Sequence, residues 1–255
     1  MTPDDSRRRF LSRLLAGTSA VVLAGCDAVS RSSWAPKLFS TGEQANKGSQ
    51  RLITAKKSLA QEFSEADLSP DFRSNGTSEP DDETYLRHVA NNFQDWKLRI
   101  DGLVRTPTEL TLAQLRSMSS RTQITRHDCV EGWSAIGKWK GVPLSEVLAL
   151  AQPTATARYV VFHCADPMDD EGTRYYESID LEDAHHPQTI LAYELNGKTL
   201  PVANGAPIRV RIERQLGYKM AKYIMRVELV DSFAQIGGGK GGYWEDQGYE
   251  WYAGI

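Results

Sequence analysis

The chain lacks three features that would each settle its class: a cysteine framework, a long apolar segment and an excess of basic residues. Its 3 cysteines among 255 residues are too few for a disulfide scaffold. No apolar run reaches the roughly 18 residues of a membrane-spanning helix, which excludes a polytopic membrane protein. With 30 basic and 33 acidic residues the net charge is -3, so nucleic acid is excluded as the expected partner. The 40% hydrophobic content predicts one globular domain with a core of ordinary size.

The N-terminus has the pattern of an export signal. Basic residues in Ser6–Leu11 (SRRRFL) precede a mild apolar stretch from Leu14 to Gly25, which is too short to span a bilayer. The arginine pair with Phe-Leu resembles a twin-arginine signal, and Leu23–Cys26 (LAGC) resembles a lipoprotein cleavage box. We therefore predict a signal peptide over residues 1–25, lipid on Cys26, and a location at the membrane surface in the periplasm or cell envelope. The alternative is a basic amphipathic first helix of a cytosolic domain.

The rest of the chain divides into a polar tether, residues 26–66, and a domain, residues 67–255. Strands are predicted near residues 96–100, 159–162, 190–195, 208–212 and 224–230, and helices at 111–118 and 143–151, with Pro143 in the first turn. Alternation of apolar with charged residues in the later strands predicts one buried face for each. Asn196-Gly197 predicts a hairpin turn. Because βαβ repetition is missing, we expect an α+β fold with a mixed or antiparallel sheet and short helices.

A glycine-rich stretch, residues 237–242 (GGGKGG), precedes several aromatic residues: Tyr243, Trp244, Tyr249, Trp251 and Tyr252. For most of them we expect an aromatic tail, fed by a flexible loop, that packs on the body. A phosphate-binding glycine loop is the weaker alternative, because the Lys-Ser/Thr pair of a P-loop is missing.

Two thiols remain if Cys26 carries lipid. Cys129 and Cys164 could form a disulfide, or both could be buried small hydrophobic residues, as suits Cys164 after the apolar residues 160–162. Cys129 differs because it lies near Arg126 and His127, whose charge could stabilise a thiolate. A nucleophile, a redox thiol and a soft metal ligand all remain open from the residues alone, whereas a zinc site and a cysteine-histidine hydrolase are poorly matched.

The sequence from about residue 71 to 230 resembles the sulfite-oxidase superfamily of molybdopterin oxidoreductases, especially the branch of the periplasmic methionine-sulfoxide reductase catalytic subunit. The matching pieces, in order, are WKLRIDGLV at 96–104, CVEGWSAIGKWKGVPLSEVL at 129–148, AHHP at 184–187, LPVANGAPIR at 200–209 and GYKMAK at 217–222. The resemblance implies a sulfite-oxidase-type molybdopterin-binding fold, without a C-terminal immunoglobulin-like domain, and molybdenum with molybdopterin as cofactors.

Position by position, the resemblance makes Cys129 the thiolate ligand of molybdenum, a soft donor suited to that metal. Other positions that match cofactor contacts of the family are Asn75, Cys164 (where the reductase branch has threonine), Asn204, Arg209, Met220, Ala221 and Lys222. Arg126, His127 and Trp133 flank the metal ligand and are predicted to shape the substrate pocket. His127 is further predicted to move a proton near neutral pH, with a structural histidine as the alternative.

The implied activity is two-electron oxygen-atom or proton-coupled electron transfer on a small substrate, with S-oxides favoured. The segment lacks the Cys-x-Gly-Asn-Arg-Arg pattern of sulfite oxidases, which argues against sulfite as the substrate. Because the chain contains no Cys-x-x-Cys-His haem motif, a membrane b-type or a c-type cytochrome is the implied electron partner. The competing function is a non-enzymatic lipoprotein that keeps the fold as a binding or assembly module.

Overall fold

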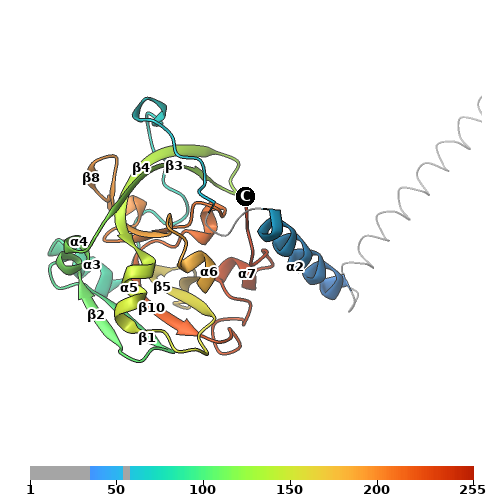
Figure 1. Cartoon of the computed structure of the whole chain (residues 1–255). Coiled ribbons are helices and arrows are strands. Elements are labelled where there is room, and N and C mark those ends of the chain that lie inside the picture. The colour runs from blue at the N-terminus through green and yellow to red at the C-terminus, as the bar shows by residue number, and fades with distance from the viewer. Residues whose placement is uncertain (1–34, 54–57) are drawn as a thin grey trace, which may run out of the picture. The chain divides into compact units, whose positions relative to one another are not determined.

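In a computed structural model the described residues, 35–53 and 58–255, belong to two separate units (Figure 1). The first contributes one helix, α2 (Ala35–Ile53), within the segment that the sequence assigns to the tether. The predicted signal peptide and Cys26 lie outside the described residues. Among the described helices, none is long and apolar enough to cross a membrane.

The second unit contains two five-stranded sheets. The first has the order β2-β1-β10-β5-β6, and β1 pairs with β10 in parallel while its other pairs are antiparallel. Its strands are β1 (Lys97–Gly102), β2 (Thr108–Thr111), β5 (Tyr159–Pro167), β6 (Arg174–Asp180) and β10 (Ile224–Val230). The predicted α+β class with a mixed sheet is thus confirmed.

The second sheet is antiparallel, with the order β3-β4-β7-β8 and with β9 also paired to β7. Its strands are β3 (Arg121–Asp128), β4 (Ser134–Pro143), β7 (Ile190–Leu195), β8 (Lys198–Thr199) and β9 (Arg209–Arg211). The predicted hairpin turn joins β7 to β8, and Asn196 and Gly197 both have positive φ, at 52° and 75°. Those angles are the ones a two-residue type I′ turn requires.

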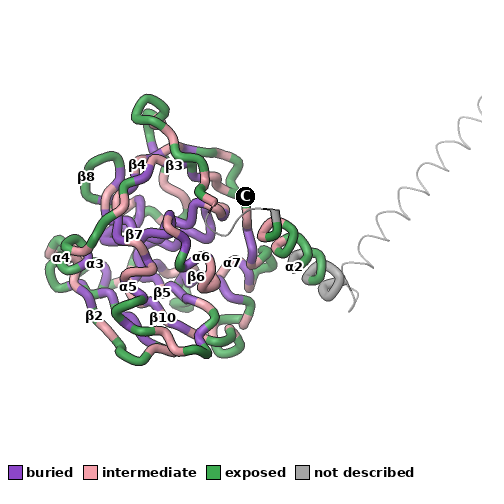
Figure 2. Tube along the Cα trace, in the orientation of Figure 1, coloured by how far each residue is buried: buried purple, intermediate pink, exposed green. Residues whose placement is uncertain are grey.

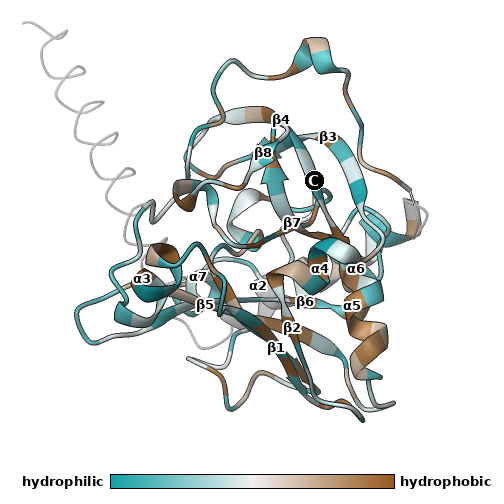
Figure 3. Cartoon of the chain, turned by 90° about the vertical axis from the view of Figure 1, so that its left-hand side faces the viewer, coloured by the Kyte–Doolittle hydropathy of each residue, from teal (hydrophilic) through white to brown (hydrophobic). Residues whose placement is uncertain are grey.

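Short helices lie around and between the sheets. In the views of Figures 1 and 3 one sheet lies above the other, and α5 contacts both β4 of the second sheet and β1 of the first. The helices of this unit are α3 (Glu83–Ala90), α4 (Leu112–Ser117), α5 (Leu144–Ala151), α6 (Leu181–Ala184) and α7 (Tyr243–Asp246). The 3-10 turns are η1 (Glu65–Asp67), η2 (Val202–Asn204) and η3 (Gly217–Lys219).

The main core fills the space between these layers (Figure 2). Leu98 and Ile100 of β1 point into it, as their alternation predicts. In α5 the buried residues recur at helical spacing, namely Leu144, Val147, Leu148 and Ala151. Pro143 occupies the N-cap position of α5, one residue before the first turn in which the sequence placed it. A proline is tolerated at either position, because the first N–H groups of a helix have no partner within the helix.

Strand β9 departs from the prediction of one buried face. Ile208, Val210 and Ile212 are buried as expected, but Arg209 and Arg211 are also fully buried. Both guanidinium groups lie over the ring of Trp139, at 5.2 Å and 4.5 Å from its centroid. The alternating pattern predicted the buried apolar face correctly. The prediction that the arginine face is exposed was wrong, because tertiary contacts cover the arginines.

Residues just before the predicted domain start already contact the body. The Ala60 N–H donates to Gln188 Oε1 (2.7 Å), and the Phe63 N–H donates to the Ile124 carbonyl of β3 (2.9 Å). The chain therefore enters this unit along the edge of the second sheet.

Candidate cofactor site

Cys129 lies at the tip of the β3–β4 hairpin. The loop closes through the Cys129 N–H, which donates to the Trp133 carbonyl (2.9 Å), and the Gly132 N–H, which donates to the Cys129 carbonyl (3.1 Å). Gly132 has φ of 84°, a conformation that disfavours side chains. This tight loop presents the thiol on a fixed turn between two paired strands.

The Cys129 side chain lines a cavity of about 220 Å³. Asn75, Met220 and Lys222 line the same cavity, so four of the predicted positions from distant parts of the sequence meet there. Other lining residues, which the sequence had not singled out for the site, include Thr77, Glu131, Asp166, Met168, Tyr175, Gly217 and Tyr218. Glu131, Gly217 and Tyr218 lie within the matching pieces of the resemblance, whereas Thr77, Asp166, Met168 and Tyr175 carried no motif. Only the folded chain brings them together.

The cations that act on the Cys129 thiol differ from the predicted ones. Burial raises the pKa of the Cys129 thiol, and the positive charges of Arg73 and Arg209 oppose this only in part. The cations that favour a thiolate are therefore these two arginines. Arg126, proposed from sequence proximity, instead pairs through Nε with Asp128 Oδ2 (3.0 Å).

His127 lies behind the cavity. Its ring is fully buried, and its Nδ1 lies 3.0 Å from Arg211 Nη1 and 3.3 Å from Met220 Sδ. Burial, followed by the charges of Arg211 and Arg209, places the pKa of His127 well below its usual value. His127 is thus neutral near pH 7, contrary to the prediction that it exchanges a proton there, and the structural-histidine alternative describes it.

Two buried arginines lie at the inner end of the site. Arg211 pairs with Glu213 (2.6 Å), whereas among the described residues Arg209 donates only to the carbonyls of Asn204 (3.1 Å) and Met220 (3.2 Å). Burial and the nearby Arg211 charge lower the pKa of Arg209 to about 9, so it still carries its charge at neutral pH.

Lys222, like Arg209, is a buried cation that donates to backbone carbonyls. Its ammonium donates to the carbonyls of Asn75 (2.7 Å), Thr77 and Ala203 (3.1 Å). Burial, then the charge of Arg209, lowers the pKa of Lys222 to about 7. The Arg209 Nε and Asn75 Oδ1 atoms are buried without a hydrogen-bond partner. Within residues 58–255 no carboxylate forms an ion pair with Arg209 or Lys222, so the site has an unfilled preference for an anion.

These observations meet the requirements of a phosphate-bearing pterin with a molybdenum centre. A dianionic phosphate would compensate the two buried cations, whereas the unpartnered Asn75 Oδ1 is an acceptor suited to an N–H or O–H group of the cofactor. Cys129 supplies a soft sulfur donor in the same cavity. The donor set is therefore compatible with molybdopterin as the resident cofactor.

Several predicted residues support the cavity from outside its lining. Arg209, Asn204 and Ala221 lie behind it, where the Arg209 guanidinium ties Asn204 to Met220 and the Ala221 carbonyl accepts from the Val210 N–H (3.0 Å). The Trp133 ring packs against His127, with centroids 5.5 Å apart, and its Nε1 donates to Glu131 (2.8 Å). Trp133 thus orients a cavity residue.

Arg126 faces elsewhere. It lines a separate cavity of about 190 Å³ together with Phe63, Asp128 and Glu213. The prediction that Arg126 shapes the same pocket as Cys129 rested on sequence proximity. In a β-strand successive side chains point to opposite faces, so Arg126 and the buried His127 diverge.

Cys164 is buried and Cys129 is half-buried, and both are free thiols, which contradicts the disulfide alternative. Burial, with the nearby Asp166 carboxylate, raises the pKa of Cys164 well above its usual value. Two positions later, Asp166 lines the cofactor cavity, and its Oδ1 is buried without a hydrogen-bond partner. Burial raises the pKa of Asp166 to about 6.

The glycine-rich stretch does not cradle a phosphate. The Gly238 N–H donates to Asp246 Oδ2 (2.7 Å) and the Lys240 N–H to Asp246 Oδ1 (3.2 Å), so the loop folds around a carboxylate. Trp251 and Tyr252 pack on the body as predicted, and Trp251 Nε1 donates to Ser178 Oγ (2.8 Å). Trp244 and Tyr249 instead line the cofactor cavity.

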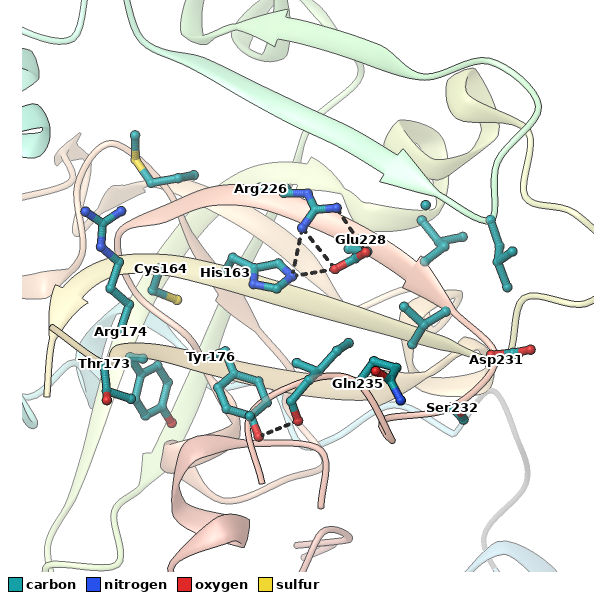
Figure 4. A pocket seen from close by; sticks show the side chains of 18 residues that line it. His163, Cys164, Thr173, Arg174, Tyr176, Arg226, Glu228, Asp231, Ser232 and Gln235 are labelled. Atoms are coloured by element: carbon teal, nitrogen blue, oxygen red, sulfur yellow. Dashed lines mark hydrogen bonds and ion pairs between the residues drawn. The ribbon is translucent and has the colours of Figure 1, made fainter. Parts of the chain in front are cut away.

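A larger groove of about 930 Å³ lies over the first sheet (Figure 4). A polar cluster crosses its strands: His163 of β5 lies 2.8 Å from Glu228 of β10, and Arg226 Nη2 pairs with Glu228 Oε1 (2.9 Å). Cys164 and Tyr175 also line this groove, and Tyr175 lines the cofactor cavity as well. Strands β5 and β6 thus separate the two hollows.

The chain matches the model of the oxidoreductase molybdopterin binding domain over residues 86–235. A protein from Azospira oryzae, provisionally named protein-methionine-sulfoxide reductase subunit YedZ1, is 37% identical over 98% of this chain and 88% of its own. The protein-methionine-sulfoxide reductase catalytic subunit MsrP of Xanthomonas axonopodis is 35% identical over 89% of this chain and 71% of its own.

Among solved structures, the sulfane dehydrogenase SoxCD from Paracoccus pantotrophus superposes with a TM-score of 0.48. Its sequence is 23% identical, and the match covers 54% of this chain and 39% of that chain.

The family match and the curated relatives confirm the resemblance, the molybdenum and molybdopterin cofactors, and the enzymatic rather than purely binding character of the chain. The Cys129 thiol, the Lys222 ammonium on the cavity lining and the Arg209 guanidinium behind it are consistent with that chemistry. The chain belongs to the oxidoreductase molybdopterin binding domain family and is a molybdopterin-dependent oxidoreductase.

Proposed function

We propose that this chain is the catalytic subunit of an S-oxide reductase of the bacterial cell envelope. The names of its relatives give methionine sulfoxide as their substrate. The observation that carries the proposal is the cavity lined by the Cys129 thiol and the Lys222 ammonium, with the buried Arg209 guanidinium behind its lining.

In this proposal Cys129 Sγ is the protein ligand of molybdenum. Lys222 and Arg209 balance the pterin phosphate, Asn75 contacts the cofactor, and the segment Asn204 and Met220–Lys222 is held in place by Arg209. Trp133 orients Glu131 beside the thiol. Cys164 supports the site as a buried neutral thiol.

Reduction of an S-oxide breaks the S–O bond, consumes two electrons and two protons, and yields a thioether and water. Cys129 would hold the molybdenum centre at the cavity, where that centre would supply the two electrons. A membrane b-type or c-type cytochrome replenishes them, because the sequence offers no haem attachment motif of its own.

The cellular part of the proposal follows from the N-terminal sequence. The twin-arginine route carries proteins already folded, which suits a chain that receives its cofactor in the cytoplasm. Lipid on Cys26 then holds the enzyme at the membrane surface, close to a membrane electron donor.

The test is Cys129→Ser in protein matured through its own export route. Wild type should contain about one molybdenum per chain by elemental mass spectrometry and reduce N-acetylmethionine sulfoxide. The variant should lose at least about 100-fold in kcat, since an oxygen donor replaces the soft ligand, with thermal stability changed by about 1 kcal/mol or less. The control is Lys198→Met, an exposed position outside the cavity lining, which should retain activity. Full activity in Cys129→Ser would contradict the ligand assignment.

A further inference from the structure

Three aromatic residues that line the cofactor cavity form what we call the aromatic wall: Tyr218, Trp244 and Tyr249. Met168 lines the same cavity. The rings of Tyr218 and Tyr249 pack edge to face with centroids 5.3 Å apart, and the Trp244 and Tyr249 rings are tilted at 5.3 Å. The Cys129 thiol lines the same cavity. A molecule that reacts at a centre on Cys129 therefore meets this wall.

Two wall residues lie outside the shared domain. The family model matches residues 86–235, whereas Trp244 and Tyr249 belong to the segment that follows it. The cofactor contacts Cys129, Arg209 and Lys222 all lie inside the match. The cavity thus combines a cofactor side built by the family domain with a wall supplied partly by a separate segment.

The wall is held rigidly although it belongs to a peripheral segment. Glu245, next to Trp244, is buried and pairs with the buried Lys219 (2.5 Å), which also pairs with Glu177. The Tyr249 N–H donates to the Trp244 carbonyl (2.9 Å), and the Tyr218 hydroxyl donates to the Glu250 carbonyl (2.6 Å). Such a preformed surface can bind a ligand without first paying an ordering cost.

The charges around the cavity indicate which substrates suit the wall. Among the described residues, the acidic side chains that line it are Glu131 and Asp166. The one lysine of that lining, Lys222, donates to three carbonyls and faces the proposed phosphate. A second oxyanion would meet these two carboxylates, whereas Arg73, which acts on Cys129 from outside the cavity lining, packs over the Trp133 ring at 5.6 Å. Aromatic faces and a methionine bind alkyl groups and polarisable sulfur favourably.

We propose that the aromatic wall recognises the alkyl groups of neutral dialkyl S-oxides, such as the side chain of methionine sulfoxide, and thereby selects them over inorganic sulfur oxyanions. The inference rests on the proposed S-oxide reductase function and assigns its substrate specificity to Trp244 and Tyr249. Lys219 and Glu245 are positioning residues, because they act through Trp244.

The test compares Trp244→Ala and Tyr249→Ala with the wild-type holoenzyme, using N-acetylmethionine sulfoxide and the smaller dimethyl sulfoxide. We expect KM for N-acetylmethionine sulfoxide to rise about tenfold in each variant, with kcat within about threefold, and a smaller change for dimethyl sulfoxide. Trp244→Phe keeps an aromatic face and should restore most of the loss. Trp251→Phe is the matched control, since Trp251 lies in the same segment but outside the cavity lining.

Calorimetric titration of the oxidised holoenzyme with N-acetylmethionine sulfoxide gives a readout independent of turnover. The Kd should rise about tenfold in Trp244→Ala and stay unchanged in Trp251→Phe, at equal molybdenum content. If wild type reduces S-oxides while both alanine variants keep its KM and Kd, the wall proposal is wrong and the proposed function stands. If molybdenum-replete wild type neither binds nor reduces an S-oxide, both proposals fail.

Discussion

Several residues at the site carry buried charge that no neighbouring carboxylate compensates among the described residues. Lys222 and Arg209 are buried cations without a carboxylate ion pair among the described residues, and His127 is forced neutral beside them. Burying each of these cations without a counter-charge lowers the free energy of unfolding. This concentration of unpaired positive charge next to a thiol is the strongest mark of a binding site for an anionic cofactor.

Lys222 gives a prediction for the cofactor-free protein. Its pKa is about 7 in the folded state against 10.5 as its ordinary value, so the folded state binds fewer protons between these pH values. Stability must therefore rise as pH increases from 7 towards 10.5. Denaturant unfolding at pH 7 and pH 9 should show about 2 kcal/mol of gain that Lys222→Met lacks. The exposed Lys198→Met should keep the gain, and an equal gain in Lys222→Met would refute the low pKa.

At the scale of elements, the second sheet depends on close backbone approach between β4 and β7. The pairing shifts register between Lys140 and Gly141, where β4 bulges. A Cβ added at Gly141 would lie 2.2 Å from the Leu191 carbonyl oxygen and 2.6 Å from the Ala192 Cα. The neighbouring strand cannot move away, because Leu191 and Ala192 also pair with β9.

Gly141→Ala should therefore destabilise this unit by about 3 kcal/mol, because the clash is with backbone and cannot be relieved by a side-chain rotation. The melting temperature measured by circular dichroism gives the effect. Gly48→Ala, in α2, places its Cβ in open space and should leave that transition unchanged. A melting temperature within about 1 °C of wild type in Gly141→Ala would show that β4 and β7 separate readily.

At the scale of the folded unit, segments from both sides of the family domain complete the cavity. Asn75–Thr77 precede residues 86–235, and Trp244 and Tyr249 follow them. The Lys222 ammonium links the first segment to the domain, and the Lys219–Glu245 pair links the second. The site is thus an assembly of three regions of the chain.

At the scale of the whole protein, the N-terminal sequence predicts export and lipid attachment. Cys26→Ala in the native host should abolish lipid attachment and move the protein from the membrane fraction to the soluble periplasmic fraction, since the lipid is the proposed anchor. Replacement of Arg7 and Arg8 by lysine should block export and leave precursor in the cytoplasm. Fractionation with immunoblotting measures both. Membrane retention of an unlipidated Cys26→Ala variant would point to anchoring by another part of the protein.

The local pattern of the sequence determined much of this protein. The apolar spacing in β1 and α5, the Asn196-Gly197 turn and the prediction of an α+β fold with a mixed sheet all follow from it, because these features depend on neighbouring residues. The motif order around Cys129 likewise predicted the family and its cofactor, which the comparisons confirm.

The tertiary structure decided what depends on distant contacts. The sequence pattern allowed an exposed face for β9, yet Arg209 is buried over Trp139, and proximity in sequence suggested Arg126 for a pocket that it does not line. Asp166, Trp244 and Tyr249 carried no site motif and reach the cavity only through folding. The environment of these residues is set by burial and by charges from distant parts of the sequence. Both arise only when strands that are far apart in the sequence pair.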